Sequence, residues 1–424
     1  MKSKATRLAA TAIFLCSAQL HALSGSGTID QEWKSYIRPL EPIAERLASY
    51  VPDSGDRQLR HEFYRNLVSQ MAMGYFALLY ADPEHPDFWP FFSQPFNGLA
   101  PNPDNDYYVT PIDDDGVYKI SGYRGTVQMV DFQIGSGAFI TRGTPDGKKL
   151  GNTLANYELD SLDIAEDGSF EVILSPERPE GYNGDWWKLD QGARNIFVRQ
   201  RAYDWINEVD ARLAIERLDR PAVRPRPSAD KLAAELEHLA VWTEQTMKAS
   251  ADFVAEMTVG LKPNELGFVD LSSYAGQITQ RYAYGVYELA DDEALILEAK
   301  LQEKPCRYWS IHLLDNYAFT MDWMNRQTSL NGHQAGIDSD NVFRAVISTQ
   351  DPGVANWLDN AGYASGFIQA RWEMCESWPE YKTKIVKFSD VLNHFPADTQ
   401  RVSAQERDED IRTRRKGAQM RKRW

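Results

Sequence analysis

Residues 306–372 constrain the fold more than any other part of this sequence, because apolar and polar side chains alternate there between turn-forming residues. In 308–314 the apolar side chains that share one face are those of Trp309, Ile311 and Leu313. Successive side chains of a β-strand point to opposite faces, so this alternation predicts a strand with one buried face. Segments 342–349 and 367–374 predict two more strands, and short strands at this spacing are typical of a β-sandwich or barrel.

A second alternating segment, 319–325, predicts a hairpin with 308–314. Its apolar residues are Phe319, Met321 and Trp323. A three-residue loop, Asp315-Asn316-Tyr317, pairs apolar residues with one another, Trp309 with Trp323 among them, whereas a two-residue loop pairs apolar residues with polar ones. A slip of one residue moves every side chain to the wrong face, so we expect the three-residue loop.

Three short runs carry a resemblance to a known family. They are Asn325-Arg326-Gln327-Thr328-Ser329-Leu330-Asn331-Gly332, Asp351-Pro352-Gly353-Val354-Ala355-Asn356-Trp357-Leu358-Asp359 and Arg371-Trp372. Together they resemble the bacterial family labelled domain of unknown function 1214, over the C-terminal third of the chain. Residues 105–125 resemble the upstream β-rich region of longer members. The resemblance implies a jelly-roll-like β-sandwich for the C-terminal domain, and it implies no activity and no catalytic residues.

The chain of 424 residues is long enough for two or three domains. We expect a mainly β protein with helical segments, in which helices link two β-sandwich-like domains and the C-terminal one is jelly-roll-like. The expected order is a signal peptide at 1–22, a helical and Pro/aromatic-rich region at 23–104, a first β-rich domain at 105–201, a helical linker at 202–262, the C-terminal sandwich at 263–400 and a charged, basic tail at 401–424. Helices are expected at 29–50, 57–81, 203–218 and 228–259, and strands of the first domain at 107–110, 116–121, 126–135, 159–164, 169–174 and 195–201.

The first 22 residues have the pattern of a secretory signal peptide. Lys2, Lys4 and Arg7 precede an apolar core at 8–18, and small residues follow. We therefore expect a periplasmic or secreted protein, and no other apolar run is long enough to span a bilayer. Loss of these three basic residues changes the formal net charge from −15 to −18. So acidic a chain is a poor nucleic-acid binder.

Two cysteines, Cys306 and Cys375, flank the C-terminal strands. An oxidising compartment allows them to form a disulfide, which would contribute about 4 kcal/mol on the loop-entropy model. Two buried thiols are the alternative.

Motifs for known chemistry are missing from the sequence. It contains no GxSxG elbow, Walker loop, dinucleotide glycine fingerprint or paired-cysteine metal spacing, so no cofactor is indicated and no metal is expected. Acidic and amide residues between 104 and 116 suit calcium, but Asx turns between strands explain them equally well. The basic residues of 412–423 predict a solvated helix, or weak contact with an anionic surface or with the protein's own acidic body.

The polar face of the predicted hairpin holds the candidate catalytic residues. Ser310 and His312 share that face, and Asp322 lies diagonally opposite His312. Neighbours two apart on one strand point in parallel, which is poor geometry for a Ser–His hydrogen bond, so a polar wall of a cleft is the alternative to a triad. If the protein is an enzyme, His312 or His333 acting with Asp322 is the simplest acid–base pair.

Candidate ligand-binding residues lie at the strand ends and loops that follow, namely Asn325, Arg326, Asn331, Trp357 and Arg371. Arg326 suits a carboxylate, or else a salt bridge to a neighbouring loop. Trp357 suits an aromatic platform, or else fills the end of the sandwich. These residues predict a protein that binds or processes a small organic or carbohydrate ligand in a cleft of the C-terminal sandwich. The alternative is a non-catalytic envelope or assembly protein that acts through protein–protein contacts, and the sequence does not decide whether the protein is an enzyme.

Overall fold

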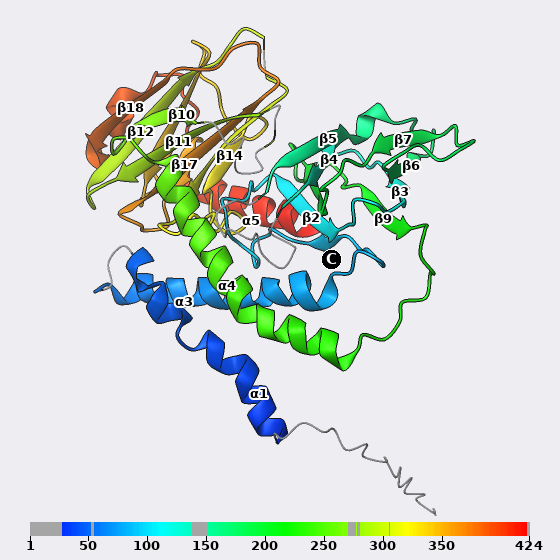
Figure 1. Cartoon of the computed structure of the whole chain (residues 1–424). Helices are drawn as coiled ribbons and strands as arrows, with labels where there is room; N and C mark the ends of the chain where they lie inside the picture. Colours follow the sequence, from blue (N-terminus) through cyan, green and yellow to red (C-terminus); the bar gives the residue numbers. More distant parts are fainter. Residues whose placement is uncertain are drawn as a thin grey trace, which may run out of the picture.

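Two β-sandwiches stand side by side, with helices beneath and between them (Figure 1). The computed structural model describes residues 28–51, 55–137, 151–269, 277, 280–304 and 306–421. The predicted signal peptide at 1–22 lies outside these residues. Within them, no helix is long and apolar enough to cross a membrane. The described chain is mainly β, as the sequence predicts.

The first sandwich is built from two mainly antiparallel sheets that bury a common core. One sheet has the order β1-β2-β8-β4-β5, with β1 at Trp89–Pro90, β2 at Asn105–Pro111, β8 at Asn195–Arg201, β4 at Met129–Gly135 and β5 at Thr153–Glu158. The other has the order β7-β6-β3-β9, in which only the β6–β7 pair is parallel, with β7 at Asp185–Lys188, β6 at Ser169–Ser175, β3 at Tyr118–Tyr123 and β9 at Arg212–Arg217. Ile120, Phe132 and Val198 are fully buried between the sheets. The expected strands at 107–110, 116–121, 126–135, 169–174 and 195–201 are confirmed within one to three residues.

The C-terminal sandwich contains three of the four strands that the sequence predicts between residues 306 and 374, namely those at 308–314, 342–349 and 367–374. One sheet has the order β10-β11-β17-β13-β14, with β10 at Leu266–Val269, β11 at Gln280–Glu288, β17 at Ser365–Glu373, β13 at Tyr308–Leu314 and β14 at Ser329–Asn331. The other has the order β16-β15-β12-β18, with β16 at Trp357–Asp359, β15 at Val342–Ser348, β12 at Glu293–Lys300 and β18 at Tyr381–Lys387. Trp309, Ile311 and Leu313 point into the core between these sheets, as predicted. Pairing β11 with β17 and β12 with β15 brings strands from distant parts of the chain together in a jelly-roll-like arrangement.

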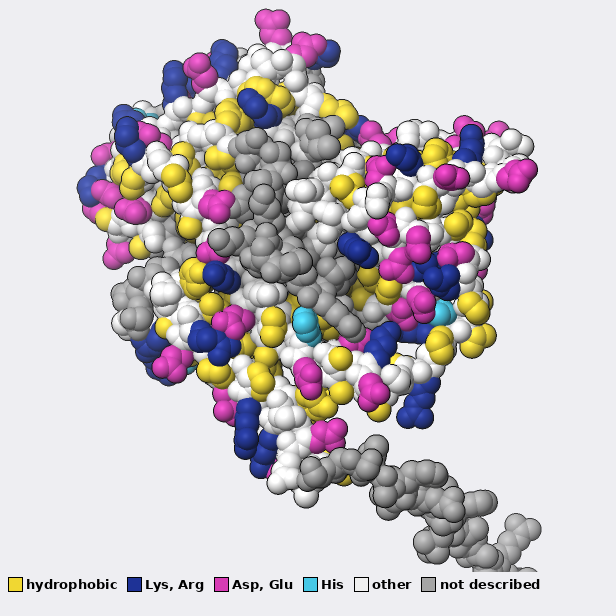
Figure 2. Space-filling model, viewed as in Figure 1, with side chains coloured by type: hydrophobic (Ala, Val, Ile, Leu, Met, Phe, Trp, Pro, Cys, Tyr) yellow, Lys and Arg dark blue, Asp and Glu magenta, His cyan; other side chains and the backbone are white. Residues whose placement is uncertain are grey.

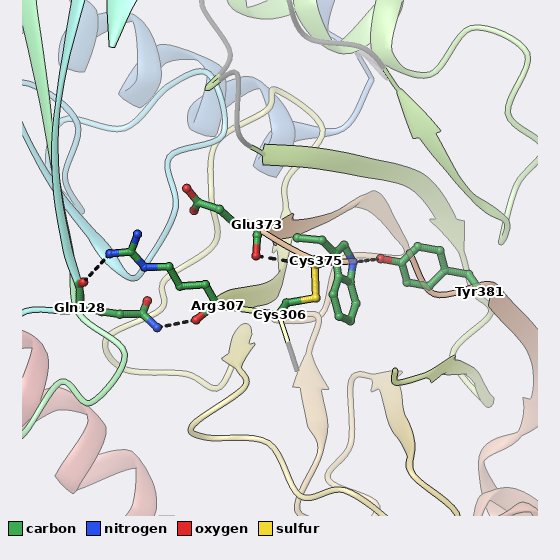
Figure 3. Close-up of a disulfide and its surroundings, with 7 residues drawn as sticks. Gln128, Cys306, Arg307, Glu373, Cys375 and Tyr381 are labelled. Atoms are coloured by element: carbon green, nitrogen blue, oxygen red, sulfur yellow. Dashed lines mark hydrogen bonds between the residues drawn. A yellow bond between two sulfur atoms is a disulfide. The ribbon is translucent and has the colours of Figure 1, made fainter. Parts of the chain in front are cut away.

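The register of β13 and β17 places the two cysteines opposite each other. Tyr308 is the partner of Glu373, so Cys306 and Cys375 lie two positions further along the same antiparallel pair. Their Cα atoms are 4.3 Å apart and a disulfide joins them (Figure 3). Beside it, the Gln128 side chain donates a 2.6 Å hydrogen bond to the Arg307 carbonyl, which links this strand end to the first sandwich.

The predicted strand at 319–325 and its hairpin pairing are wrong. β13 lies between β17 and β14, and of the segment only Thr320 forms a bridge, with Leu314. Trp309 stacks on Trp372 at a centroid distance of 5.3 Å, whereas Trp323 is buried in the core of the first sandwich. Local hydrogen bonds account for the departure, because Asp315 and Asp322 each accept bonds from backbone N–H groups that follow them.

Two further predictions of secondary structure are wrong and a third is only partly right. The helix expected at 203–218 contains strand β9, whose side chains alternate in burial against β3. The strand expected at 159–164 contains a 3₁₀ turn, η4, at Leu159–Ser161. The helix expected at 29–50 is broken near Pro39 and Pro42, because proline lacks a backbone N–H. It forms α1 at Ile29–Ile37, η1 at Arg38–Leu40, α2 at Ile43–Arg46 and η2 at Ala48–Tyr50.

The longer helices lie where the sequence predicts them. α3 spans Arg57–Gly74 and continues as the π-helical segment η3 at Tyr75–Tyr80. α4 spans Ala229–Met257, preceded by Ser228, whose hydroxyl accepts a hydrogen bond from Lys231 N. A 3₁₀ segment, η6, at Phe388–His394 precedes α5 at Ala404–Met420, which lies between the two sandwiches (Figure 1).

Helix α5 ends against the protein's own body. Arg421 is buried and pairs with Asp210 at 2.9 Å. Arg414 donates to the carbonyl of Trp323 at 2.5 Å and lies over the Trp205 ring. These two arginines of the tail are therefore bonded within the fold. Contact with the protein's own body was one of the alternatives that the sequence leaves open for the tail.

Candidate functional site

The facing sheets of the two sandwiches bury a layer of polar side chains. In β8 and β17 the alternate positions 198 and 370 lie in the apolar cores, so their neighbours face outward, away from those cores. We call these buried outward-facing residues the interdomain layer, which comprises Arg199, Arg201, Tyr308, Ser310, His312, Gln369, Arg371 and Glu373. Two of the three residues of the predicted triad, Ser310 and His312, are therefore buried instead of facing solvent.

An ion pair between Arg201 and Glu373 crosses the layer. Both side chains are 0 % exposed. Arg201 also donates to Asn105 and to Gln277, each at 3.0 Å, and its guanidinium lies 4.4 Å from the centre of the Tyr308 ring. A buried charge is tolerated only when it is paired and its hydrogen bonds are satisfied, so this pair fixes how the sandwiches meet.

Asp104 forms a second buried cluster in the same interface. It accepts hydrogen bonds from Tyr308 at 2.5 Å and from Asn331 and Trp205 at 2.8 Å each. Burial raises the pKa of the Asp104 carboxyl, and these three hydrogen bonds oppose the rise. The predicted ligand-binding residue Asn331 thus lies at this junction, with 0 % of its surface exposed.

His312 and Arg371 contact each other within the layer. Arg371 Nη1 lies 3.1 Å from His312 Nδ1, and Nη2 donates to the Ala100 carbonyl at 2.7 Å. Burial, followed by the charge of Arg371, lowers the pKa of His312 well below 6.5. The imidazole is therefore neutral near pH 7.

The other predicted site residues lie apart from His312, although Asn325 donates a hydrogen bond to Asp322 at 2.8 Å. Asp322 caps a turn by accepting from Met324 N and Asn325 N at 3.2 and 3.1 Å. Arg326 pairs with Asp359 at 2.7 Å, and His333 lies 3.7 Å from Asp204.

Trp357 is buried at the edge strand β16. Its indole N–H donates to the Ser348 carbonyl at 3.0 Å, and Arg407 lies over its ring.

Acidic residues between 104 and 116 pair with arginine. Asp113 and Asp115 lie beside Arg217, with Nη2 of Arg217 3.4 Å from Asp115. Within the described part of the chain, no three His, Cys, Asp or Glu side chains are grouped so as to hold a metal ion. Basic and acidic side chains are interspersed over the face shown in Figure 2.

A cavity of about 290 Å³ lies where the N-terminal helices and α4 meet the C-terminal sandwich. We call it the helix–sandwich cavity, and its lining residues are Leu47, Ser49, Tyr50, Phe63, Met247, Ser250, Ala251, Ala255, Thr258, Asn316, Tyr317, Phe319 and Phe367. The sequence indicates an apolar face on α3 but gives no sign that residues from five separate segments line one space.

The turn that forms one wall of the cavity is held by Asp315. This carboxylate is 3 % exposed and accepts hydrogen bonds from Tyr317 N at 2.9 Å and Phe319 N at 3.0 Å. Burial raises its pKa to about 7, while those hydrogen bonds oppose the rise; Glu62 adds to it and Arg65 opposes it. The folded state therefore binds this proton more tightly than the unfolded chain.

We expect Asp315→Asn to stabilise the protein at pH 8 and to change little at pH 4. A raised carboxyl pKa gives stability that is full below the ordinary value of 3.8 and is lost as the pH rises through about 7. Asparagine keeps the acceptor oxygen without the charge, so the gain at pH 8 is on the order of 2 kcal/mol in unfolding free energy. Urea unfolding at several pH values measures this change in unfolding free energy. The control variant is Asp322→Asn, in which the same substitution is made in another turn. An equal gain at pH 4 and pH 8 would contradict the assignment.

Comparisons with known proteins place the family match elsewhere than predicted. Residues 143–205 match the family described as "Protein of unknown function (DUF1214)", which covers strands of the first sandwich. The predicted position in the C-terminal third is therefore wrong, because the three runs quoted above lie outside the matched residues. A search of curated proteins finds no match.

One solved structure supports the arrangement of most of the chain. The crystal structure of an uncharacterised protein from Burkholderia cenocepacia is similar at a TM-score of 0.77 and 28% identity, over 85% of this chain and 98% of that one. A protein from Vibrio parahaemolyticus matches over 76% of this chain and 98% of that one, at 12% identity and a TM-score of 0.41. This chain is thus similar in fold to the Burkholderia protein and resembles the DUF1214 family over residues 143–205.

Proposed function

We propose that this protein is exported and binds a small organic molecule in the helix–sandwich cavity. The observation that carries the proposal is the cavity of about 290 Å³. Protein interiors are close-packed, and an apolar cavity of about 150 Å³ is already enough to hold benzene. The disulfide between Cys306 and Cys375 supports export to a periplasmic or extracellular compartment, because structural disulfides persist in oxidising surroundings.

The residues that line the helix–sandwich cavity favour binding of a ligand over its chemical conversion, and an organic ligand over a carbohydrate. None of the described lining residues is His, Cys, Asp or Glu, so the cavity wall offers no ordinary general acid or base. Most of these residues are aromatic or aliphatic, whereas a sugar needs several hydrogen-bonding partners. Only Asn316, Tyr317, Phe319 and Phe367 come from the C-terminal sandwich, where the sequence predicts the whole cleft.

We expect Ala251→Leu to remove ligand-dependent stabilisation, because the added carbons occupy the cavity. A ligand at about 100 times its Kd adds about 2.7 kcal/mol to unfolding free energy, which a thermal-shift screen of small organic molecules detects. The matched control is Ala234→Leu, the same change at an exposed position of α4. The proposal would be contradicted if the ligand-dependent thermal shift were lost in Arg326→Ala and His333→Ala but kept in Ala251→Leu. That result would place the ligand beside Arg326 and His333.

An assembly role is the second candidate, favoured by helix α1. No residue of α1 is buried, and Ile29 and Trp33 are 89% and 56% exposed. The helix projects from the body (Figure 1). Concentration-dependent self-association that is lost in Trp33→Ser, with no ligand response in the screen, would favour this candidate over ligand binding.

A further inference from the structure

We infer that the helix–sandwich cavity takes a neutral, aromatic molecule of two-ring size that carries a hydrogen-bonding group. The inference rests on the proposed function and adds the chemical class of the ligand. Three properties of the wall lead to it, namely its charge, its shape and the hydrogen bonds that its polar side chains have already made.

The wall carries no counter-charge for an ion. Among the described lining residues there is no Lys, Arg, His, Asp or Glu. An ionised ligand would lose its hydration without gaining a partner, which is unfavourable by several kcal/mol per charge. The cavity therefore selects against carboxylates, phosphates and amines.

Aromatic rings from two sides shape the space. Phe63 of α3 and Tyr317 of the turn lie with ring centroids 6.0 Å apart, and Phe319 and Phe367 line the same cavity. Aromatic pairs prefer offset or edge-to-face contacts at this range, so an aromatic ring bound in the cavity would gain the same contacts with these side chains. Met247 adds an adaptable apolar wall. Since about 150 Å³ holds one benzene ring, a volume of about 290 Å³ suits two.

Most polar groups of the wall are already bonded. Tyr50 donates to Asp252 at 3.2 Å and Tyr317 to the Leu59 carbonyl at 2.9 Å. Asn316 accepts from Ser365 through Oδ1 at 3.2 Å, and that bond does not use its amide N–H₂ donors. This amide is thus suited to one hydroxyl or carbonyl group on the ligand.

The test is a calorimetric titration of the mature chain with 2-naphthol and with 2-naphthoate, which differ in charge at pH 7. We expect 2-naphthol to bind and 2-naphthoate to bind at least about ten-fold more weakly. Asn316→Ala should weaken 2-naphthol binding by about five-fold, the loss of one hydrogen bond. Ala251→Leu should abolish binding and Ala234→Leu should preserve it. Ala255→Leu, at the exposed side of the wall, serves as a second blocking variant if Ala251→Leu does not fold.

The outcomes separate the inference from the proposed function. Binding of 2-naphthoate as tight as that of 2-naphthol, still lost in Ala251→Leu, would overturn the ligand class and leave the cavity as the binding site. Binding of 2-naphthol that both blocking variants leave unchanged would overturn the cavity as the site as well. Binding of neither probe, while the screen finds a charged ligand blocked by Ala251→Leu, would overturn the ligand class alone. Binding of neither probe and an empty screen would overturn both.

Discussion

Replacing Glu373 with glutamine lowers the free energy of unfolding by about 3–5 kcal/mol, because it leaves the Arg201 guanidinium buried without its counter-charge. Both side chains of this ion pair are 0 % exposed, so water cannot replace the lost carboxylate. Urea denaturation of the two proteins measures the difference. The loss falls on the contact between the sandwiches, since Arg201 belongs to β8 and Glu373 to β17.

An exposed ion pair provides the matched control. Lys304 and Glu376 pair with side chains that are 69% and 64% exposed, so Glu376→Gln should cost less than about 1 kcal/mol. The double variant Arg201→Met/Glu373→Leu should recover much of the loss, because no unpaired charge remains. An equal effect of Glu373→Gln and Glu376→Gln would contradict the structural role of the buried pair.

Replacing both Cys306 and Cys375 with serine should lower the free energy of unfolding by about 4 kcal/mol. The bond closes a loop between residues 69 positions apart, and without it the unfolded chain gains conformational entropy. Wild-type protein that has been reduced with dithiothreitol should match the double variant in urea denaturation. If the double variant and the reduced wild-type protein were both as stable as the oxidised protein, the disulfide would contribute nothing to the free energy of unfolding.

The strands that the sequence predicts well are those with one face in an apolar core. The alternation in 308–314 correctly predicts β13 at these residues. Only one register of such a strand places all of its apolar side chains in the core. Segment 319–325 has the same alternation but forms no strand, because Asp315 and Asp322 bind nearby backbone N–H groups and turn the chain away. Local hydrogen bonds of this kind compete with sheet pairing, and the spacing of apolar residues gives no information about them.

The site was less predictable than the fold. Ser310 and His312 share the predicted polar face, yet that face is buried, with residues 100–104 bonded to the neighbouring Tyr308 and Arg371, and nothing in the local sequence indicates this partner. The cavity wall combines residues as distant as Leu47 and Phe367, so only the tertiary structure brings them together. Arg326 pairs with Asp359 at the end of strand β16, so it forms a salt bridge, the alternative to ligand binding, although its partner belongs to a strand and not to a loop.

Arg421 has a consequence for the order in which the protein is completed. Its side chain donates to the carbonyls of Asp104 and Gln200 and pairs with Asp210, all of which belong to the first sandwich or border it. A ribosome makes those three residues between 211 and 317 positions before it reaches the arginine that bonds to them. The first half of the chain can therefore form these buried bonds only after nearly all of the remaining chain has been translated.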